Sequence, residues 1–437
     1  MNIDSLIHAR WIIPVVPEGQ ILEHHSLAID KDKIIDLLPT SEAKPKYQAS
    51  NEFTLTSHAL LPGLINAHTH GAMNLFRGLA DDLPLMDWLT NHIWPAEQKW
   101  ISPEFVRDGT QLAVAEMIRG GITCFNDMYF FPDATADVAT EYGVRAGIGL
   151  ILIDFPTAWA HDADEYIYKG EQVHDKYRHN PLVHTVFAPH APYTVSDAPL
   201  ARISTLAEEL NIPIHMHVHE TRDEVEGSVK QHGKRPLQRL HELGLVNERL
   251  LAVHMTQLQK DEIELIARYG VHVLHCPESN LKLASGFCPV HELQEAGVNV
   301  ALGTDGAASN NDLDMFAEMR TAALLAKGVA NTPTALPARK ALSMATINAA
   351  RALNIDTITG SLEINKSADV IAVNLNQIET LPLFDPVSQI VYACSRQQVT
   401  DVWVAGTQLL DNSEFTRIDR EQLLNNVTNW QSRISAS

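Results

Sequence analysis

Apolar runs of strand length recur through the middle of the chain, and amphipathic segments of helical length separate them. Residues 105–121, FVRDGTQLAVAEMIRGG, are typical of these separating segments, because apolar residues return every three or four positions. Strands that alternate with helices in this way predict parallel β/α units. Eight such strands are expected, at residues 60–70, 121–128, 144–154, 182–190, 212–220, 250–255, 271–277 and 299–305.

Eight parallel strands with intervening helices predict a closed, TIM-like (β/α)8 barrel, which is an α/β fold. In such barrels the functional site lies at the carboxyl ends of the strands. Most of the eight runs end in His, Asp or Glu, although the packing of a barrel strand requires no polar residue there. The repetition therefore indicates a site. Both ends of the chain show a different pattern of apolar and polar residues, which predicts short strands joined by polar turns, such as those at 30–33 and 405–406.

Composition narrows the classes of protein that need to be considered. The chain has 437 residues, more than the roughly 250–300 at which a single core stops growing, so we expect one large domain and a smaller one. A formal charge of −21 argues against nucleic acid or an anionic membrane as a partner. The four cysteines are scattered and form no CxxC pair, which fits a reducing compartment. The N-terminus does not resemble a signal peptide, and no apolar run is long enough to span a bilayer. We therefore expect a cytoplasmic protein.

The first predicted barrel strand ends in two histidines, His68 and His70. Alternate residues of a strand face the same side, so both imidazoles can converge on one ion. Two neutral imidazoles suit zinc or iron better than magnesium or calcium. Taken alone, such a pair more often consists of solvated or core histidines than of metal ligands, so the prediction depends on the other strands.

The fifth predicted strand places His215, His217 and His219 on one face, directly before Glu220. Only one of these histidines needs to bind a metal. His215 lies deeper in the strand, where a hydrogen-bonded core histidine is the favoured interpretation. His217 and Glu220 form an HxxE pattern at the strand end, which places a carboxylate beside a metal ligand. Such a glutamate can carry a proton between a water molecule and the substrate.

The sixth and eighth predicted strands end in His254 and Asp305. Each residue has a structural alternative. His254 could be a core histidine, and Asp305 could belong to a turn, because Asp-Gly is a common turn dipeptide. The whole set of strand-end residues is nevertheless hard to obtain by chance and predicts a metal site, formed by His68, His70, His217, Glu220, His254 and Asp305.

Four segments that carry these residues resemble the amidohydrolase superfamily. They are PGLINAHTHGAMNLFRG (62–78), HVHE (217–220), AVHM (252–255) and LGTDGAASNN (302–311). Within its deaminase and chlorohydrolase branch, the chain is most similar to 5′-methylthioadenosine/S-adenosylhomocysteine deaminases, over nearly its whole length. The resemblance implies a catalytic barrel at residues 59–365. It also implies a small β-sandwich domain built from residues 1–58 and 366–437, the latter ending in a helix.

The resemblance also implies roles for individual residues. His68, His70, His217 and Asp305 resemble ligands of one divalent metal per subunit, zinc or else iron. Glu220, His254 and Asp305 resemble the catalytic residues that handle protons. Segments 94–100 and 188–196 resemble the substrate-binding part, in which Glu97 and His190 would contact the ribose hydroxyls and Glu220 the base. The alternative interpretations are a helix-surface carboxylate for Glu97 and a structural histidine for His190.

One departure from the superfamily bears on the number of metal ions. Members with two metals usually carry a lysine at the end of the fourth strand, where it becomes carbamylated and bridges the ions. That strand ends here in FAPHAPY (187–193), without a lysine. The resemblance therefore implies a single metal.

The expected function is hydrolytic deamination of an adenine nucleoside, preferentially 5′-methylthioadenosine, by a homo-oligomer. Residues 150–170 follow the third strand and contain no arginine, and Lys169 is their only cation besides histidine. This lining suits a neutral thiomethyl group better than the amino acid of S-adenosylhomocysteine, unless another residue such as Arg77 binds that tail. The alternatives are another deaminase, a triazine-type chlorohydrolase, a non-catalytic scaffold and a nucleoside carrier.

Overall fold

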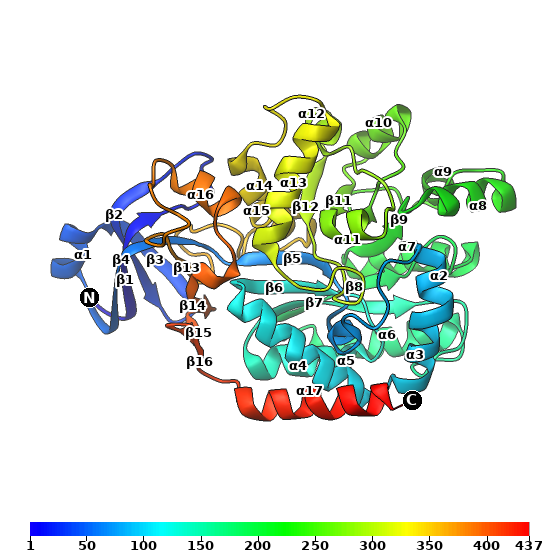
Figure 1. The fold of residues 1–437 in the computed structure, drawn as a ribbon, viewed down its shortest axis with the longest axis horizontal. Coiled ribbons are helices and arrows are strands. Elements are labelled where there is room, and N and C mark those ends of the chain that lie inside the picture. The colour runs from blue at the N-terminus through cyan, green and yellow to red at the C-terminus, as the bar shows by residue number, and fades with distance from the viewer. Residues whose placement is uncertain (437) are drawn as a thin grey trace.

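A barrel of eight parallel strands forms the larger part of the computed structural model, which describes residues 1–436 (Figure 1). All eight predicted strands are present, each within its expected range, and they pair in chain order, which confirms the predicted fold class. The barrel strands are β5 (Leu64–Thr69), β6 (Ile122–Asp127), β7 (Arg145–Leu152), β8 (Val183–Pro189), β9 (Ile214–Val218), β10 (Leu250–His254), β11 (His272–His275) and β12 (Asn299–Leu302).

Helices surround the barrel and connect its strands. They are α4 (Pro103–Arg119), α5 (Pro132–Tyr142), α6 (Ala163–Tyr177), α7 (Asp197–Leu210), α8 (Arg222–His232), α9 (Pro236–Glu242), α10 (Lys260–Arg268), α11 (Pro277–Lys282), α12 (Val290–Glu295), α13 (Met315–Val329), α14 (Ala338–Met344) and α15 (Ile347–Ala352). Helix α4 confirms the amphipathic segment predicted at 105–121, and its first turn is capped by the Ser102 side chain. Among the described residues, no helix is long and apolar enough to span a bilayer.

A long insertion between β5 and α4 contributes to the carboxyl end of the barrel. It contains a 3-10 turn η1 (Gly71–Phe76), α2 (Leu85–Asp87), a π-helical turn η2 (Trp88–Ile93) and α3 (Trp94–Trp100). Several of its apolar side chains are buried, including those of Trp88 and Ile93.

The first and last strands of the barrel meet through an unusually close backbone contact. The Asp305 N–H, just beyond β12, donates a hydrogen bond of 3.0 Å to the carbonyl of His68 in β5. At Gly303 a Cβ atom would lie only 2.7 Å from the His68 backbone nitrogen, so only glycine allows this approach. The contact brings the residues at the ends of these two strands together.

The two ends of the chain form one eight-stranded mixed sheet, in the order β16-β15-β14-β13-β4-β1-β2-β3. Its strands are β1 (Asn2–Ile12), β2 (Leu22–Asp30), β3 (Lys33–Pro39), β4 (Gln48–Pro62), β13 (Val370–Asn374), β14 (Val399–Val404), β15 (Thr407–Asp411) and β16 (Glu414–Phe415). Antiparallel pairing of β4 with β13 joins the N-terminal and C-terminal halves. The turns predicted at 30–33 and 405–406 are confirmed, the second with positive φ at both central residues.

Three short elements and a terminal helix complete the described chain: α1 (Thr40–Lys46), α16 (Pro386–Tyr392), η3 (Arg396–Gln398) and α17 (Arg420–Ser435). Helix α17 runs along α4 (Figure 1). The indole N–H of Trp430 in α17 donates a hydrogen bond of 2.7 Å to Asp108 in α4. The C-terminal helix is thereby attached to the barrel rather than to the mixed sheet.

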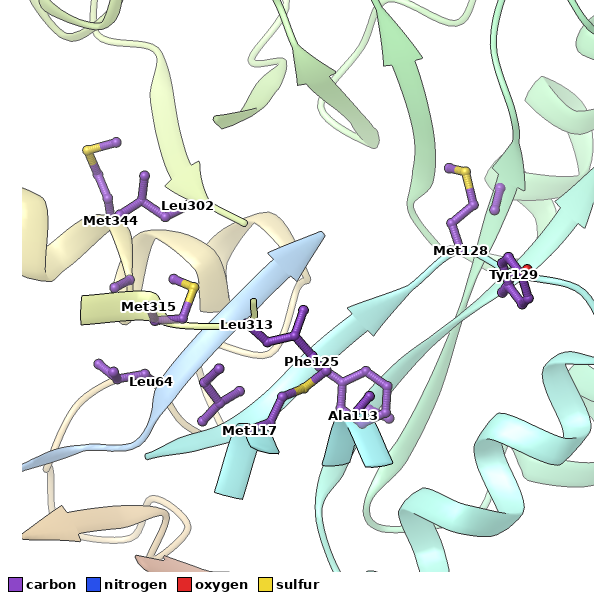
Figure 2. Close-up of a cluster of buried hydrophobic side chains, with 14 of the residues drawn as sticks. Leu64, Ala113, Met117, Phe125, Met128, Tyr129, Leu302, Leu313, Met315 and Met344 are labelled. Atoms are coloured by element: carbon purple, nitrogen blue, oxygen red, sulfur yellow. The ribbon is translucent and has the colours of Figure 1, made fainter. Parts of the chain in front are cut away.

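Apolar packing between the barrel wall and its helices fixes the strands (Figure 2). Ala113 and Met117 on the inner face of α4 belong to the same buried cluster as Phe125 of β6. The segment that follows the eighth strand contributes Leu313 and Met315 to this cluster. Each of the Leu, Phe and Met side chains contributes about 1.5–3 kcal/mol when it is fully buried. The strand ends are therefore held by rigid packing beneath them.

A buried ion pair connects the barrel to the mixed sheet. Arg145 at the start of β7 contacts Asp369, just before β13, with Nε 3.0 Å from Oδ2, and Nη2 also contacts Oδ1 at 3.3 Å. Arg145 donates further hydrogen bonds to Ser367 and to the carbonyl of Pro181. Both charged groups are buried, so each depends on the other to offset the loss of solvation.

Asp369→Asn should destabilise the protein by about 3–5 kcal/mol, because it leaves the Arg145 charge buried without its counter-ion. The free energy of unfolding in urea, measured at saturating zinc, tests this. Glu18→Gln is the matched control. It breaks the exposed Glu18–Lys340 pair, which also connects the N-terminal segment to the barrel and should matter by no more than about 1 kcal/mol. An Asp369→Asn loss as small as that of the control would contradict the role of the buried pair.

Candidate metal centre and substrate cavity

Four side chains from three strand ends converge at the carboxyl end of the barrel. His68 and His70 come from the end of β5, His217 from β9 and Asp305 from the segment after β12. One potential ligand atom from each lies within 4.8 Å of the others. The Oδ1 atom of Asp305 is 3.3 Å from Nε2 of His68 and 3.2 Å from Nε2 of His70. Three imidazole nitrogens and one carboxylate could hold one divalent ion.

The second nitrogen of each histidine ring is held by a neighbour. His70 donates from Nδ1 to the Met128 carbonyl at 2.6 Å, and His217 donates from Nδ1 to the His190 carbonyl at 2.8 Å. The Nδ1 atom of His68 lies 2.8 Å from Nε2 of His215. These contacts direct Nε2 of His68 and His70 towards Asp305, and Nε2 of His217 lies 3.3 Å from Nε2 of His68. Such outer contacts are typical of metal-binding histidines, so the residues present fit zinc.

Charge within the group favours an ionised Asp305. Burial alone would raise the pKa of Asp305, but its contacts with His68 and His70 bring that pKa well below the usual value. Burial lowers the pKa of His68 to about 4, whereas the Asp305 contact outweighs burial at His70 and raises its pKa to about 9. A cation bound here would therefore replace a proton on His70 and meet a preformed negative charge.

Two residues of the site have left-handed backbone conformations, which is uncommon for residues other than glycine. Asp305 has φ of 62° and His254 has φ of 73°. Backbone of this kind costs about 1–3 kcal/mol and persists only where the surrounding structure imposes it. At both positions it turns the chain sharply at the strand end.

Glu220 and His254 lie beside the four potential ligands. Glu220 follows β9, is 5% exposed, and has Oε1 3.8 Å from Nε2 of His254. Burial, with a smaller effect from the charge of Asp305, raises the pKa of Glu220 to about 8. Burial also lowers the pKa of His254, which is held through Nδ1 by the Asn280 side-chain oxygen at 2.8 Å. At neutral pH Glu220 is therefore a carboxylic acid and His254 a neutral imidazole.

A cavity of about 610 Å³ opens above this group. Its inner end is polar and its remaining wall is largely apolar. The apolar lining includes residues of the insertion and of the loop after β7: Leu85, Trp88, Leu89, Ile93, Trp94, Ile101, Phe155 and Pro156. The volume is typical of a small-molecule site.

Glu97 and His190 line the same cavity from different elements. Glu97 lies on α3 and accepts a hydrogen bond of 2.8 Å from the Tyr129 hydroxyl. Burial raises the pKa of Glu97 to about 7. His190 follows β8, lies within hydrogen-bond distance of Thr194 at 3.0 Å, and is kept neutral because burial lowers its pKa to about 3. Seven of the eight residues proposed from the sequence thus line one cavity, and the eighth, His68, is fully buried behind them, with Nε2 3.3 Å from Asp305.

The structure also shows side-chain contacts around the site that the sequence did not predict. Ser279 and Ser309 donate hydrogen bonds to Asp305, Asn280 holds His254, and Tyr129 holds Glu97. One signal could have pointed to two of them. Ser279 and Asn280 lie in CPESN, directly after the seventh predicted strand, so they occupy the same position in their β/α unit as the other strand-end residues.

Known proteins resemble the chain over almost its full length. Residues 59–409 match the amidohydrolase family. A protein of Saccharophagus degradans named 5-methylthioadenosine/S-adenosylhomocysteine deaminase is 51% identical, over 99% of this chain and 97% of that protein. The crystal structure of an adenosine deaminase from Xanthomonas campestris with bound zinc has 53% identity and a TM-score of 0.99, over 100% of this chain and 99% of that chain.

The fold is also shared with a more distant protein. An atrazine chlorohydrolase from Arthrobacter aurescens, complexed with zinc, has a TM-score of 0.92 at 23% identity, over 98% of this chain and 100% of that chain. At this identity the likeness concerns the fold alone. The family match and the close relatives show more: the chain belongs to the amidohydrolase family and, within it, to the 5-methylthioadenosine/S-adenosylhomocysteine deaminases.

Proposed function

We propose that this protein is a zinc-dependent hydrolase that removes the amino group from C6 of an adenine nucleoside. The preferred substrate is 5′-methylthioadenosine, which yields 5′-methylthioinosine and ammonia. S-adenosylhomocysteine and adenosine are secondary substrates. One observation carries the proposal: a buried carboxylic acid, Glu220, lies beside a three-histidine, one-aspartate group at the inner end of a cavity. The names of the relatives support the reaction.

In this proposal His68, His70, His217 and Asp305 hold one zinc ion. Zinc supplies a nucleophile at neutral pH, because it lowers the pKa of a water molecule from 15.7 to about 7. The absence of a lysine at the end of β8, where His190 stands, supports a single ion.

Glu220 acts as the general acid. Its carboxyl group is protonated at neutral pH, since its pKa is about 8, and it can donate that proton to N1 of adenine. Protonation of N1 withdraws electrons from the ring and makes C6 more electrophilic. The resulting carboxylate can then accept a proton and pass it to the departing amine.

Asp305 and His254 act on the side of the ring that water attacks. Asp305 remains ionised and accepts a proton from the attacking water. His254 holds its own proton on Nδ1, towards Asn280, so that Nε2 is free to accept a hydrogen bond from this water. Once it is protonated, the same nitrogen stabilises negative charge on the attacking oxygen.

Glu97 and His190 bind the ribose. Glu97 accepts a hydrogen bond from Tyr129 and has remaining lone pairs for a sugar hydroxyl. His190 offers the ring nitrogen that does not face Thr194. Both side chains line the cavity, which supports this assignment over helix-surface or purely structural roles.

The chemistry of the outer cavity favours a neutral 5′ substituent. Among the described residues that line the cavity, none is Lys or Arg. Lys169 is paired with Glu165 at 2.8 Å and also donates to the Trp159 carbonyl. Arg77 does not line the cavity and is paired with Glu116. An amino-acid carboxylate would therefore lack a lysine or arginine partner and meet only the His161 imidazole on the loop after β7, whereas a thiomethyl group would meet apolar side chains.

We also propose that the protein forms a homo-oligomer in the cytoplasm and binds no nucleic acid. Ile378 and Phe384, each 92% exposed, support contact between chains, because both are large apolar residues on the segment between β13 and α16. Four free, buried cysteines are consistent with a reducing compartment. The net charge of −21 opposes binding to phosphate backbones.

The purified protein should contain one zinc ion per chain, and His68→Ala or Asp305→Ala should lose it, because each removes one of four ligands. Metal analysis by mass spectrometry measures this. His215→Asn is the control, since that ring contacts His68 without facing Asp305, and this variant should keep more zinc than His68→Ala. Two metal equivalents in active protein, or full zinc content in both ligand variants, would contradict the assignment.

Glu220→Gln should lower kcat by about 10²–10⁴-fold while zinc content and KM change little, because an amide cannot transfer the proton. The wild-type pH profile provides a second measurement. Deprotonation of Glu220 removes the acid form, so kcat/KM should fall as the pH rises through about 8. Near-normal turnover of the Gln variant would exclude Glu220 as the acid.

Steady-state kinetics should give at least about a tenfold higher kcat/KM for 5′-methylthioadenosine than for S-adenosylhomocysteine, which corresponds to about 1.4 kcal/mol. The physical reason is that no lysine or arginine lines the cavity to pair with the carboxylate. Introducing one by Phe155→Arg should narrow the difference, while Phe155→Leu controls for the loss of the ring. Equal or reversed preference in the wild type would show that the outer cavity does not set specificity.

A further inference from the structure

Helix α11 is a short element that follows β11 and lies beside the proposed centre. Two of its consecutive residues, Ser279 and Asn280, are almost completely buried, with exposed fractions of 0% and 2%. Polar side chains are rarely buried so deeply unless their hydrogen bonds are satisfied. Both residues direct those bonds to the side chains on which the proposed reaction depends.

Ser279 holds Asp305. Its hydroxyl donates a hydrogen bond of 2.6 Å to Oδ2 of Asp305, and Ser309 donates to the same oxygen at 2.9 Å. The other oxygen, Oδ1, is the one that faces His68 and His70. Two donors on Oδ2 therefore fix the plane of the carboxylate, so that Oδ1 remains directed at the metal position.

Asn280 holds His254. Its Oδ1 accepts the Nδ1 proton of His254 at 2.8 Å, which leaves Nε2 directed towards Glu220. The amide nitrogen of Asn280 is buried without a hydrogen-bond partner within the described residues. The structural contribution of this side chain therefore rests on a single acceptor oxygen, and that oxygen determines which nitrogen of His254 carries the proton.

Helix α11 is itself fixed against α13. Glu318 of α13 is fully buried and accepts a hydrogen bond of 3.3 Å from the Glu278 N–H in α11. Its other oxygen accepts 2.7 Å from the Asn310 side chain, in the segment after Asp305. Thr321 of α13 donates to the Glu278 carboxylate at 2.7 Å. The helix and the Asp305 segment thus share one rigid support.

We infer that Ser279 and Asn280 are positioning residues with separate tasks: Ser279 orients Asp305 for metal binding, and Asn280 fixes the tautomer of His254 for proton transfer. The inference rests on the roles proposed above for Asp305 and His254. It requires the two neighbouring residues to differ in their effects, because only Asp305 is a proposed metal ligand.

The first test uses Ser279→Ala and measures zinc retention against a competing chelator. Outer hydrogen bonds to metal ligands contribute about 10–100-fold to metal affinity. Because Ser309 still donates to Oδ2, we expect the lower end, about tenfold. Ser285→Ala is the matched control, since that buried hydroxyl on the following loop has no hydrogen-bond partner within the described residues. It should retain wild-type zinc affinity and kcat.

The second test compares Asn280→Ala with Asn280→Asp in zinc-loaded enzyme. Asn280→Ala should lower kcat about 10–100-fold with little change in KM and none in zinc retention. Asn280→Asp keeps an acceptor oxygen and loses no hydrogen bond, because the replaced nitrogen has no partner. It should therefore recover most of the wild-type kcat, with a changed pH profile. Thermal unfolding of each variant separates folding defects from these effects.

Two results would overturn the inference. One is wild-type zinc retention in Ser279→Ala together with wild-type kcat in Asn280→Ala. The other is a parallel loss of zinc, kcat and thermal stability in both alanine variants, with no recovery in Asn280→Asp, which would show that α11 only supports the fold. If the wild-type protein deaminates no adenine nucleoside, the proposed function fails instead, and zinc retention in Ser279→Ala still decides the role of Ser279.

Discussion

The closure of the barrel between its first and last strands is the contact on which the site depends. The Asp305 N–H reaches the carbonyl of His68 because Gly303 has no side chain to separate the two strands. These residues are far apart in the sequence, and no local structure could bring them together. The same close approach places the Asp305 carboxylate beside His68 and His70, so this arrangement does not depend on a bound ion. The contact that closes the barrel therefore also places the potential metal ligands next to one another.

Burial then gives the side chains around this contact their protonation states. The same loss of solvation raises the pKa of the acids Glu220 and Glu97 and lowers that of the base His190, because in each case the charged form is disfavoured. Asp305 and His70 are exceptions, because the contacts of Asp305 with His68 and His70 outweigh burial, lower the pKa of Asp305 and raise that of His70. One apolar cavity thus contains a neutral acid, a neutral base and an ionised carboxylate within a short distance.

The sequence predicted the barrel and six of the eight candidate site residues because both leave regular signals, whereas Glu97 and His190 were proposed from the family resemblance alone. A buried strand appears in the sequence as an apolar run, and a polar residue at the end of such a run is easy to recognise. Ser279 and Asn280 leave only the weaker signal of their position after the seventh strand, and Tyr129 was not singled out by any pattern. A serine or asparagine after a strand is ordinary in a loop, and its importance depends on which distant side chain it meets. The Tyr129–Glu97 contact also depends on how the insertion folds over the barrel, which local periodicity does not determine.

In the proposed assignment, in which Glu97 binds the ribose, its position on α3 couples recognition of the sugar to enclosure of the substrate. The insertion that carries this carboxylate also supplies much of the apolar wall of the cavity. A nucleoside that engages Glu97 therefore contacts the covering segment and the barrel at once, and so bridges them. A free base has no sugar, so it would contact the barrel but would not engage Glu97 on the insertion. Exclusion of bulk water is thus coupled to the size of the substrate, and discrimination against free adenine would follow from architecture rather than from a dedicated contact.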